Sequence, residues 1–336
     1  MRILVTGGCG FLGSHFVRAW LRHRPDDNIT NIDCLTYAGS LDNLQETASH
    51  VRYRHVSADI ADHDAMHDIW SAGFDTVVHF AAETHVDRSL EDASRFVRTN
   101  VLGTQVLLEH ARRRGGISVL IVSSDEVYGP TPKGVVFGIG EPLRPTSPYA
   151  ASKAAADWMA LAYRSSFDLD VTIVRSVNVY GPRQYPEKFI PLFVTNALSG
   201  IAMPLYGHGR QRRSWLHVDD FVSGVMAIVA DPDKRSEKPV WHLGSNEEFE
   251  NREIAKRICE LCHADPALIT NVSDRPGHDQ RYALDYSQTQ RIFGWVPAVP
   301  FETGLTNTAE WIRHNIDWCR SRRTWTPQFI RAEPRE

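Results

Sequence analysis

The chain has 336 residues, of which 42% are hydrophobic and 23% are charged. This is enough apolar material for a large buried core or for two domains that share one. The formal net charge is −4 and the sequence pI is about 6.4, so no global positive field would attract nucleic acid or an anionic membrane. We therefore expect a compact protein that binds neither.

The beginning of the chain and its cysteines indicate where the protein works. A strand-like run at residues 3–5 follows Met1 and Arg2 directly, which leaves no room for an export signal. No apolar run approaches the roughly 20 residues that span a bilayer. The five cysteines form an odd, scattered set and not a secreted disulfide framework. We expect a cytoplasmic protein with reduced thiols.

Two of these cysteines, Cys259 and Cys262, form a C-x-x-C pair. The pair falls in a helical pattern, and no second pair of ligands stands at the spacing of a zinc site. The sequence therefore predicts no metal.

Hydrophobic periodicity predicts strands that alternate with helices through the first half of the chain. Strands are expected at residues 3–6, 29–33, 51–56, 76–80, 119–123 and 171–175, with a later one at 240–243. Helices are expected at residues 11–22, 64–70, 101–113 and 148–165. This alternation is typical of βαβ units, which build a parallel sheet with helices on both faces.

Glycines follow the first predicted strand where the first helix begins. Gly7, Gly10 and Gly13 give the spacing G-x-x-G-x-x-G, and Phe11 and Leu12 lie inside the motif. In a dinucleotide-binding unit, such glycines form the turn, admit the pyrophosphate and let helix and strand pack closely. The position between a strand and a helix predicts a Rossmann-type NAD site and not a simple turn.

Asp33 ends the second predicted strand, about 20 residues beyond the last glycine. A carboxylate there accepts hydrogen bonds from the adenosine ribose and repels a 2′-phosphate, so NAD is favoured over NADP. The alternative is that Asp33 only caps a turn. Further candidates for the cofactor edge are Asp59, Ile60, Ala81, Ala82 and Asn100.

Two carboxylates, Asp125 and Glu126, follow the predicted strand at 119–123 and precede Tyr149 and Lys153. Tyr149 and Lys153 are one helical turn apart and share a face. An ammonium and an oxidised nicotinamide can lower a tyrosine pKa from about 10 to about 7, so that the phenolate takes a proton from a substrate hydroxyl. An exposed helix pair is the alternative. The two acids imply a further proton-transfer step.

From about Asn178 the alternation gives way to segments marked by proline and glycine. We predict an α/β fold, a Rossmann-type doubly wound parallel sheet with a smaller, mixed α/β substrate-binding lobe built from C-terminal segments. The NAD-binding domain would comprise residues 1–176 with about 214–244, and the lobe residues 177–213 and 245–336. The ligand cleft would lie between them.

Sequence blocks along nearly the whole chain resemble the extended short-chain dehydrogenase/reductase family and, within it, the dTDP-glucose 4,6-dehydratases. The blocks lie at residues 6–15, 35–39, 79–89, 123–129, 147–153, 186–191 and 274–282. Similar epimerases generally lack both members of the Asp125-Glu126 couple, and similar UDP-glucuronate decarboxylases have Ser-Glu there. The couple therefore points to a dehydratase, an NAD-dependent lyase of deoxysugar biosynthesis.

The resemblance implies that dTDP-glucose is converted to dTDP-4-keto-6-deoxyglucose and water. Tyr149, with Lys153 and Ser124, would take the proton of the C4 hydroxyl as hydride passes to NAD. Glu126 would remove the C5 proton and protonated Asp125 would release the C6 hydroxyl as water. Hydride would then return to C6, so that NAD is not consumed. Two acids with opposite protonation duties need different environments.

Arginines are expected at the diphosphate, because they bind phosphates bidentately. The resemblance assigns Arg213 to this role and Arg275 to the phosphates or the base, with His278 close by. Arg210 and Arg212 are interpreted as a solvated loop. Further substrate contacts implied by the resemblance are Thr84, His85, Asn178, Glu187, Lys188 and Asn246.

Three departures from the family pattern leave the nucleotide and the sugar open. Val179 stands where a second asparagine is usual, Ser214 stands where an aspartate is usual, and residues 131–140 are unusually apolar. A dehydratase of another nucleotide sugar, such as a UDP-sugar, is therefore an alternative, although residues 276–279 favour thymidine. A catalytically silent nucleotide-binding protein is the alternative from another class, against which the intact catalytic set argues.

The resemblance also implies a homodimer that pairs the helices at 101–113 and 148–165. Apolar side chains such as Trp158 and Leu161 are compatible with such an interface and equally with a core. The polar, proline-marked tail beyond Arg320 is expected to be frayed or packed on the surface.

Overall fold

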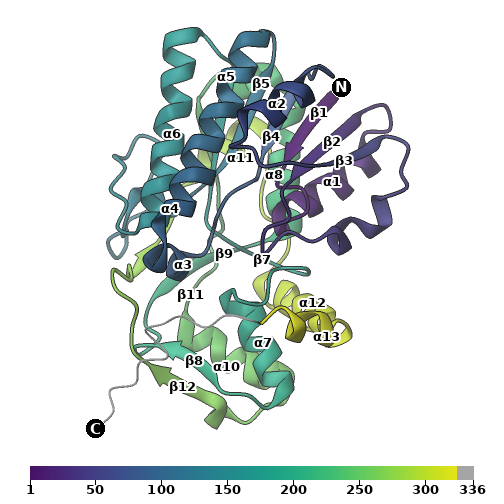
Figure 1. Cartoon of the computed structure of the whole chain (residues 1–336). Coiled ribbons are helices and arrows are strands. Elements are labelled where there is room, and N and C mark those ends of the chain that lie inside the picture. The colour runs from purple at the N-terminus through teal and green to yellow at the C-terminus, as the bar shows by residue number, and fades with distance from the viewer. Residues whose placement is uncertain (324–336) are drawn as a thin grey trace.

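The computed structural model describes residues 1–323 and has an upper parallel sheet flanked by helices above a smaller lobe (Figure 1). The segments of the lobe come from the second half of the chain, as the green and yellow ribbons show. The prolines of the predicted tail fall on residues 324–336, outside the described residues.

Seven strands form the main sheet in the order β10-β6-β5-β4-β1-β2-β3, and all of them are parallel. They are β1 (Arg2–Thr6), β2 (Asn28–Asp33), β3 (Tyr53–Ser57), β4 (Thr76–His79), β5 (Ser118–Ser124), β6 (Val171–Ser176) and β10 (Val240–Leu243). The strand order reverses between β1 and β4, which is the switch point where such sheets bind ligands. The predicted doubly wound, Rossmann-type sheet is confirmed.

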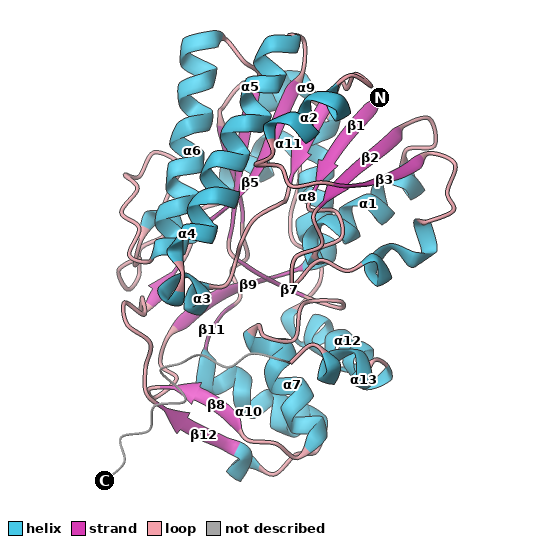
Figure 2. Ribbon diagram, viewed as in Figure 1, coloured by secondary structure: helices cyan, strands magenta, loops and turns pink. Residues whose placement is uncertain are grey.

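Helices cover both faces of this sheet (Figure 2). Those around it are α1 (Phe11–His23), α2 (His63–Trp70), α3 (Val86–Glu91), α4 (Ala93–Phe96), α5 (Thr104–Arg114), α6 (Pro148–Phe167), α8 (Val218–Ala230), α9 (Pro232–Ser236) and α11 (Ser287–Phe293). Because side chains alternate along a strand, Ile3 and Val5 join one core with Phe221 of α8, whereas Leu4 joins a second core with Leu107 of α5. The sheet is therefore buried on both faces.

The lobe is a mixed α/β unit with its own core around Phe193, Trp215 and Phe301. Its strands are β7 (Asn178–Tyr180), β8 (Met203–Tyr206), β9 (Arg212–His217), β11 (Glu248–Glu250), β12 (Ile269–Val272) and β13 (Arg281–Tyr282). Its helices are α7 (Phe189–Ser199), α10 (Asn251–Cys262), α12 (Phe301–His314) and α13 (Ile316–Ser321). The chain returns to the main sheet through α8 and β10, and the predicted domain boundaries remain a proposal.

The structure also describes the cysteines, possible metal ligands and the apolar character of the helices. All five cysteines are free thiols, and Cys259 and Cys262 lie in α10. Within residues 1–323, no group of three or more histidine, cysteine or acidic side chains is arranged to hold a metal ion. None of the described helices has the length and apolar character needed to cross a membrane.

Candidate active site

The glycine loop between β1 and α1 leaves space only for glycine at two positions. Gly7 has a φ of +71°, and a Cβ there would lie 2.5 Å from the backbone nitrogen of Ala81. A Cβ on Gly13 would lie 2.3 Å from the carbonyl oxygen of Gly7. Gly10 is the N-cap of α1, whose first turn holds no acidic residue. The loop therefore presents a helix N-terminus that suits a pyrophosphate.

Asp33 is held in a fixed orientation at the end of β2. Its two oxygens accept hydrogen bonds from the backbone nitrogens of Cys9 (2.9 Å) and Leu35 (2.8 Å), and burial raises the pKa of its carboxyl. Each carboxylate oxygen can accept more than one hydrogen bond. Asp33 therefore organises the turn and also lines the cavity described next, where it can receive ribose hydroxyls.

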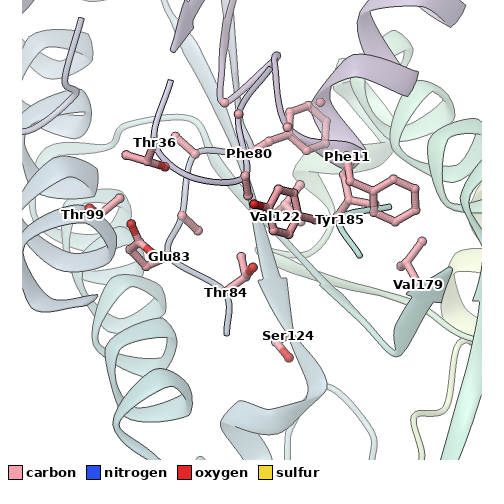
Figure 3. A pocket seen from close by; sticks show the side chains of 18 of the residues that line it. Phe11, Thr36, Phe80, Glu83, Thr84, Thr99, Val122, Ser124, Val179 and Tyr185 are labelled. Atoms are coloured by element: carbon pink, nitrogen blue, oxygen red, sulfur yellow. The ribbon is translucent and has the colours of Figure 1, made fainter. Parts of the chain in front are cut away.

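One cavity extends from the glycine loop along the carboxyl ends of the strands to the lobe, and Figure 3 shows part of its wall, with Phe11, Thr84, Ser124 and Tyr185 among the labelled side chains. Predicted site residues in the wall are Gly7, Gly10, Phe11, Leu12, Gly13, Asp33, Asp59, Ile60, Ala81, Ala82, Thr84, Ser124, Asp125, Glu126, Tyr149, Asn178, Glu187 and Lys188. Predicted site residues outside this wall are His85, Asn100, Lys153, Arg213, Asn246, Arg275 and His278. The structure thus gathers most of the predicted cofactor and reaction residues around one cavity, whereas Asn100 and Lys153 lie outside its wall.

Asn100 lies behind the cavity wall. It sits in a π-helical turn (Val97–Gly103) and is almost fully buried. Its side chain accepts from the backbone nitrogen of Glu83 (2.9 Å) and donates to the Glu83 carbonyl (3.0 Å) and to Ser152 (2.8 Å). Asn100 therefore joins the segment after β4 to α6 and supports the wall without lining it.

A short helical turn after β5 carries the two acids. This 3₁₀ turn (Asp125–Tyr128) is capped by Ser124, whose Oγ accepts from the backbone nitrogen of Glu126 at 3.2 Å. Gly129 ends the turn with a φ of +73°, and a Cβ there would lie 2.3 Å from the Arg144 carbonyl oxygen. The local sequence therefore fixes both carboxyl groups at the carboxyl edge of the sheet.

The two acids lie in different electrostatic surroundings. Asp125 is 3% exposed, and burial, followed by the charge of Glu126, raises the pKa of Asp125 to about 7. Its Oδ2 has no hydrogen-bond partner among the described residues. Burial also raises the pKa of Glu126, but Arg275, Arg213 and Lys188 oppose this. Three cations thus favour the ionised form of Glu126. Among the main influences on the pKa of Asp125, Arg213 is the one cation.

Tyr149 and Lys153 lie on α6, which begins at Pro148 with Ser147 as its cap. Both side chains are buried, so the alternative of an exposed helix pair is wrong. Lys153 Nζ donates to the Val122 carbonyl of β5 at 2.7 Å. Burial lowers the pKa of Lys153 to about 8, which a neighbouring aspartate on the next turn of α6 opposes.

Without a cofactor, the protein raises the pKa of Tyr149. The sequence predicts a lowered pKa only when an oxidised nicotinamide is bound. Burial is the main cause, followed by the negative charge of Glu126, while a hydrogen bond with Ser124 acts in the opposite direction. The acids next to the tyrosine disfavour its phenolate. Activation therefore requires the positive charge of an oxidised nicotinamide in addition to Lys153.

The predicted phosphate ligands approach the acids from the lobe. Arg213 is 5% exposed, lies over the ring of Tyr282 at 4.4 Å and donates to the Asp279 carbonyl at 2.8 Å. Arg275 lies 3.5 Å from Asp87. Both arginines act on the charge of Glu126, which places them beside the reaction centre.

The other predicted substrate residues divide into two groups. His278 bonds to Asp274 at 2.6 Å, and burial lowers its pKa. His85 is buried, and its Nδ1 lies 3.9 Å from a carboxylate oxygen of Asp87. In contrast, Asn246 is exposed, and Arg212 pairs with the carboxylate at position 248 at 2.6 Å. The lobe thus supplies His278, whereas His85 comes from the segment before α3, and Asn246 lies outside the cavity wall.

Sequence reasoning missed Tyr37, Asp87 and Arg88. Arg88 donates to Glu187 at 3.0 Å and its guanidinium lies 4.0 Å from the centre of the Tyr37 ring. Asp87 accepts from Tyr206 at 2.8 Å. Tyr37 lies in the sequence block at 35–39, and Asp87 and Arg88 lie in the block at 79–89. The adjacent charged residues Asp87 and Arg88 inside that block were the signal that could have identified them.

Comparison with known proteins defines the class. The sequence profile of a family described as GDP-mannose 4,6 dehydratase matches residues 4–308, and the chain belongs to this family. At the level of individual proteins, it is 47% identical to a dTDP-glucose 4,6-dehydratase of Streptomyces niveus, an alignment that covers 95% of this chain and 94% of the relative.

Solved structures agree with the sequence comparison. The structure of DesIV, a dTDP-glucose 4,6-dehydratase of Streptomyces venezuelae with NAD bound, is similar with a TM-score of 0.92 and 45% identity, over 96% of this chain and 100% of that one. A UDP-glucose 4-epimerase of Thermus thermophilus in complex with NAD has a TM-score of 0.85 and 29% identity, over 93% of this chain and 99% of that one. The fold is therefore shared across two reaction types, and the reaction must be argued from the site.

Proposed function

We propose that this chain is an NAD-dependent dTDP-glucose 4,6-dehydratase, which converts dTDP-glucose to dTDP-4-keto-6-deoxyglucose and water. The observation that carries the proposal is the buried Asp125-Glu126 couple, which shares one cavity with Tyr149 and the glycine loop. A simple dehydrogenase or epimerase has no use for two further acids at the sugar. The high identity to dTDP-glucose 4,6-dehydratases supports the same reaction.

The residues present fit NAD. The helix N-terminus without acidic residues would hold the pyrophosphate, Asp33 would accept ribose hydroxyls, and small Ala81 and Ala82 would let the cofactor pass close to the backbone. Bound there, NAD would supply the hydride acceptor for oxidation of the sugar and the hydride donor for the later reduction. Ser124 and Tyr149 hold the C4 oxygen, and Tyr149 takes its proton while Lys153 supports the developing phenolate.

The division of labour between the acids follows from their surroundings. A ketone at C4 acidifies the C5 proton, and Glu126, whose ionised form three cations favour, removes it. Asp125, whose pKa is raised to about 7, holds a proton that it gives to the departing C6 hydroxyl. We assign the diphosphate to Arg213 and Arg275, and contacts with the sugar to Glu187 and Lys188, which lie in the cavity wall.

We propose in addition a homodimer built on α5 and α6. Trp158 on α6 is 60% exposed, and Val97 and Leu102 on the adjoining π-helical turn are 56% and 43% exposed. Large apolar side chains gathered on neighbouring elements are typical of a surface that a second copy covers. We also propose a cytoplasmic enzyme, since free thiols suit a reducing compartment.

A two-substrate assay tests the proposal and the nucleotide preference together. The enzyme is incubated with dTDP-glucose and, in parallel, with UDP-glucose, and the alkali-induced absorbance of the 4-keto product is followed. We expect turnover of dTDP-glucose and much weaker turnover of UDP-glucose. Faster turnover of UDP-glucose would show that the enzyme is a dehydratase of a UDP-sugar. Absence of product from both substrates would favour a catalytically silent nucleotide-binding protein.

A further inference from the structure

Three segments far apart in the sequence meet above the cofactor end of the cavity. The loop of residues 35–40 follows β2, α3 follows β4, and residues 182–188 lead into α7. Tyr37 of the first segment and Tyr185 of the third make an edge-on ring contact, with centroids 5.3 Å apart. Residues 36, 38 and 39 and residues 184, 185, 187 and 188 line the cavity. The main sheet and the lobe are thus in contact at the wall of this cavity.

Arg88 joins these segments from α3. Its guanidinium lies 4.0 Å from the centre of the Tyr37 ring, while its Nε donates to Glu187 at 3.0 Å. The side chain of Arg88 is 21% exposed and that of Glu187 is 7% exposed. Cation–π contacts and charge-assisted hydrogen bonds strengthen when they are removed from water. Arg88 therefore links the loop at 35–40 to the lobe through two partly desolvated contacts.

The loop at 35–40 and the lobe segment at 182–188 each make further hydrogen bonds outside their contact with each other. The backbone nitrogen of Ser40 donates to the carbonyl of Cys9 in the glycine loop at 3.0 Å. On the lobe side, the Tyr185 hydroxyl donates to the carbonyl of Arg322, whose guanidinium bonds Asp42 at 2.7 Å. Movement of the loop away from the lobe would break contacts at both ends and open the cavity.

We propose that residues 35–40 and 182–188 form a clasp over bound NAD, and that Arg88 is the positioning residue that holds the clasp closed. The inference rests on NAD as the cofactor of the proposed function. A cofactor that takes a hydride and returns it within one cycle has no need to leave between cycles. A closed clasp keeps the cofactor in place until the hydride has returned to the sugar.

The test measures cofactor exchange, which does not depend on turnover. Enzyme loaded with isotopically labelled NAD is mixed with excess unlabelled NAD, and the label that stays bound is followed over time by rapid gel filtration. Arg88→Met removes the charge and the planar group, and we expect exchange at least about tenfold faster than in the parent, as the loss of one cation–π contact and one ion pair implies. The exchange rate of Arg88→Lys should fall between those of the parent and Arg88→Met, because lysine keeps the charge but lacks the planar guanidinium with its several donors.

A matched control exists in the lobe. Arg257 on α10 makes the same two kinds of contact, with the ring of Phe249 at 4.2 Å and with the carboxylate of Glu302, away from the cavity wall. Arg257→Met should leave exchange unchanged. If Arg88→Met does not fold, Tyr37→Leu removes the ring and keeps the ion pair of Arg88 with Glu187, and it should also speed exchange.

The outcomes separate the clasp from the proposed function. Parental enzyme that binds NAD, together with variants at position 88 and position 37 that exchange it at the parental rate, would overturn the clasp and leave the dehydratase proposal standing. Faster exchange in the Arg257 control as well would also overturn it, since the effect would then be general loosening. A parental enzyme that binds no NAD would contradict the proposed function itself, and the clasp with it.

Discussion

Burial raises the pKa of both adjacent acids, Asp125 and Glu126, but three cations oppose the rise at Glu126 and one opposes it at Asp125. The difference comes from cations of the lobe, since Arg275 and Lys188 act on Glu126 and are not among the main influences on Asp125. Sequence could place both acids at the end of β5, because they directly follow an apolar strand. It could not predict how the surroundings of the two acids differ, because the cations that create the difference come from the lobe.

Asp125→Asn tests the role of the acid. The amide cannot protonate the departing C6 hydroxyl, so we expect product formation to fall by roughly 10²–10⁴-fold, while oxidation at C4 continues. Single-turnover measurement of reduced-nicotinamide absorbance alongside product release checks this. Product release at the parental rate would show that another group donates the proton.

The same substitution should alter stability with a defined pH dependence. The carboxyl of Asp125 has an ordinary pKa of 3.8 and a folded-state pKa raised to about 7, so burial of its charge destabilises the fold increasingly as pH rises between these values. Asp125→Asn should therefore be more stable than the parent at pH 8 by on the order of 4 kcal/mol, with the gain vanishing near pH 4. Urea unfolding across this range measures it, and an equal difference at both ends would contradict the raised pKa.

The elimination step should also weaken in alkaline solution. Asp125 is protonated below its pKa of about 7, and the proton is lost as pH rises through that value. We expect the single-turnover rate of elimination to decline above this pH, whereas bound NAD is retained. A rate that rises across the same range would indicate that Asp125 acts as a base.

At the scale of elements, the periodic patterns of the first half correspond to real strands and helices, and α6 begins at Pro148 as the proline indicates. The errors lie at boundaries set by tertiary contacts. The third strand begins at Tyr53, because Val51 is 95% exposed and unpaired with the sheet. The helix expected from residue 101 begins with a π-helical turn, whose Asn100 is fixed by contacts with Glu83 and Ser152.

The proposed dimer surface belongs to this scale. A charge at position 158 would have to be buried against a second copy, so Trp158→Glu should shift the protein from dimer toward monomer in sedimentation velocity. Val51→Glu is the control, since that side chain is exposed on a different part of the chain. A Trp158→Glu protein that sediments as the parental dimer would place the interface elsewhere.

At the scale of the whole molecule, the sheet supplies the cofactor side of the cavity and the lobe supplies charge to the reaction centre. The lobe is built from separate segments that join β9 in one sheet, and such pairings between distant segments leave no periodic signal in the sequence. For this reason the sequence predicted the glycine loop and the acids, but it missed Arg88, whose partners Tyr37 and Glu187 come from two other segments.

In the proposed reaction one hydride moves within the sugar, from C4 to C6, while the acids remove water. The most direct measurement uses dTDP-glucose that carries deuterium at C4, with product analysed by nuclear magnetic resonance. We predict deuterium in the C6 methyl group of the 4-keto product and a solvent-derived hydrogen at C5. An unlabelled C6 methyl group in the 4-keto product, with the deuterium lost to solvent, would contradict this transfer.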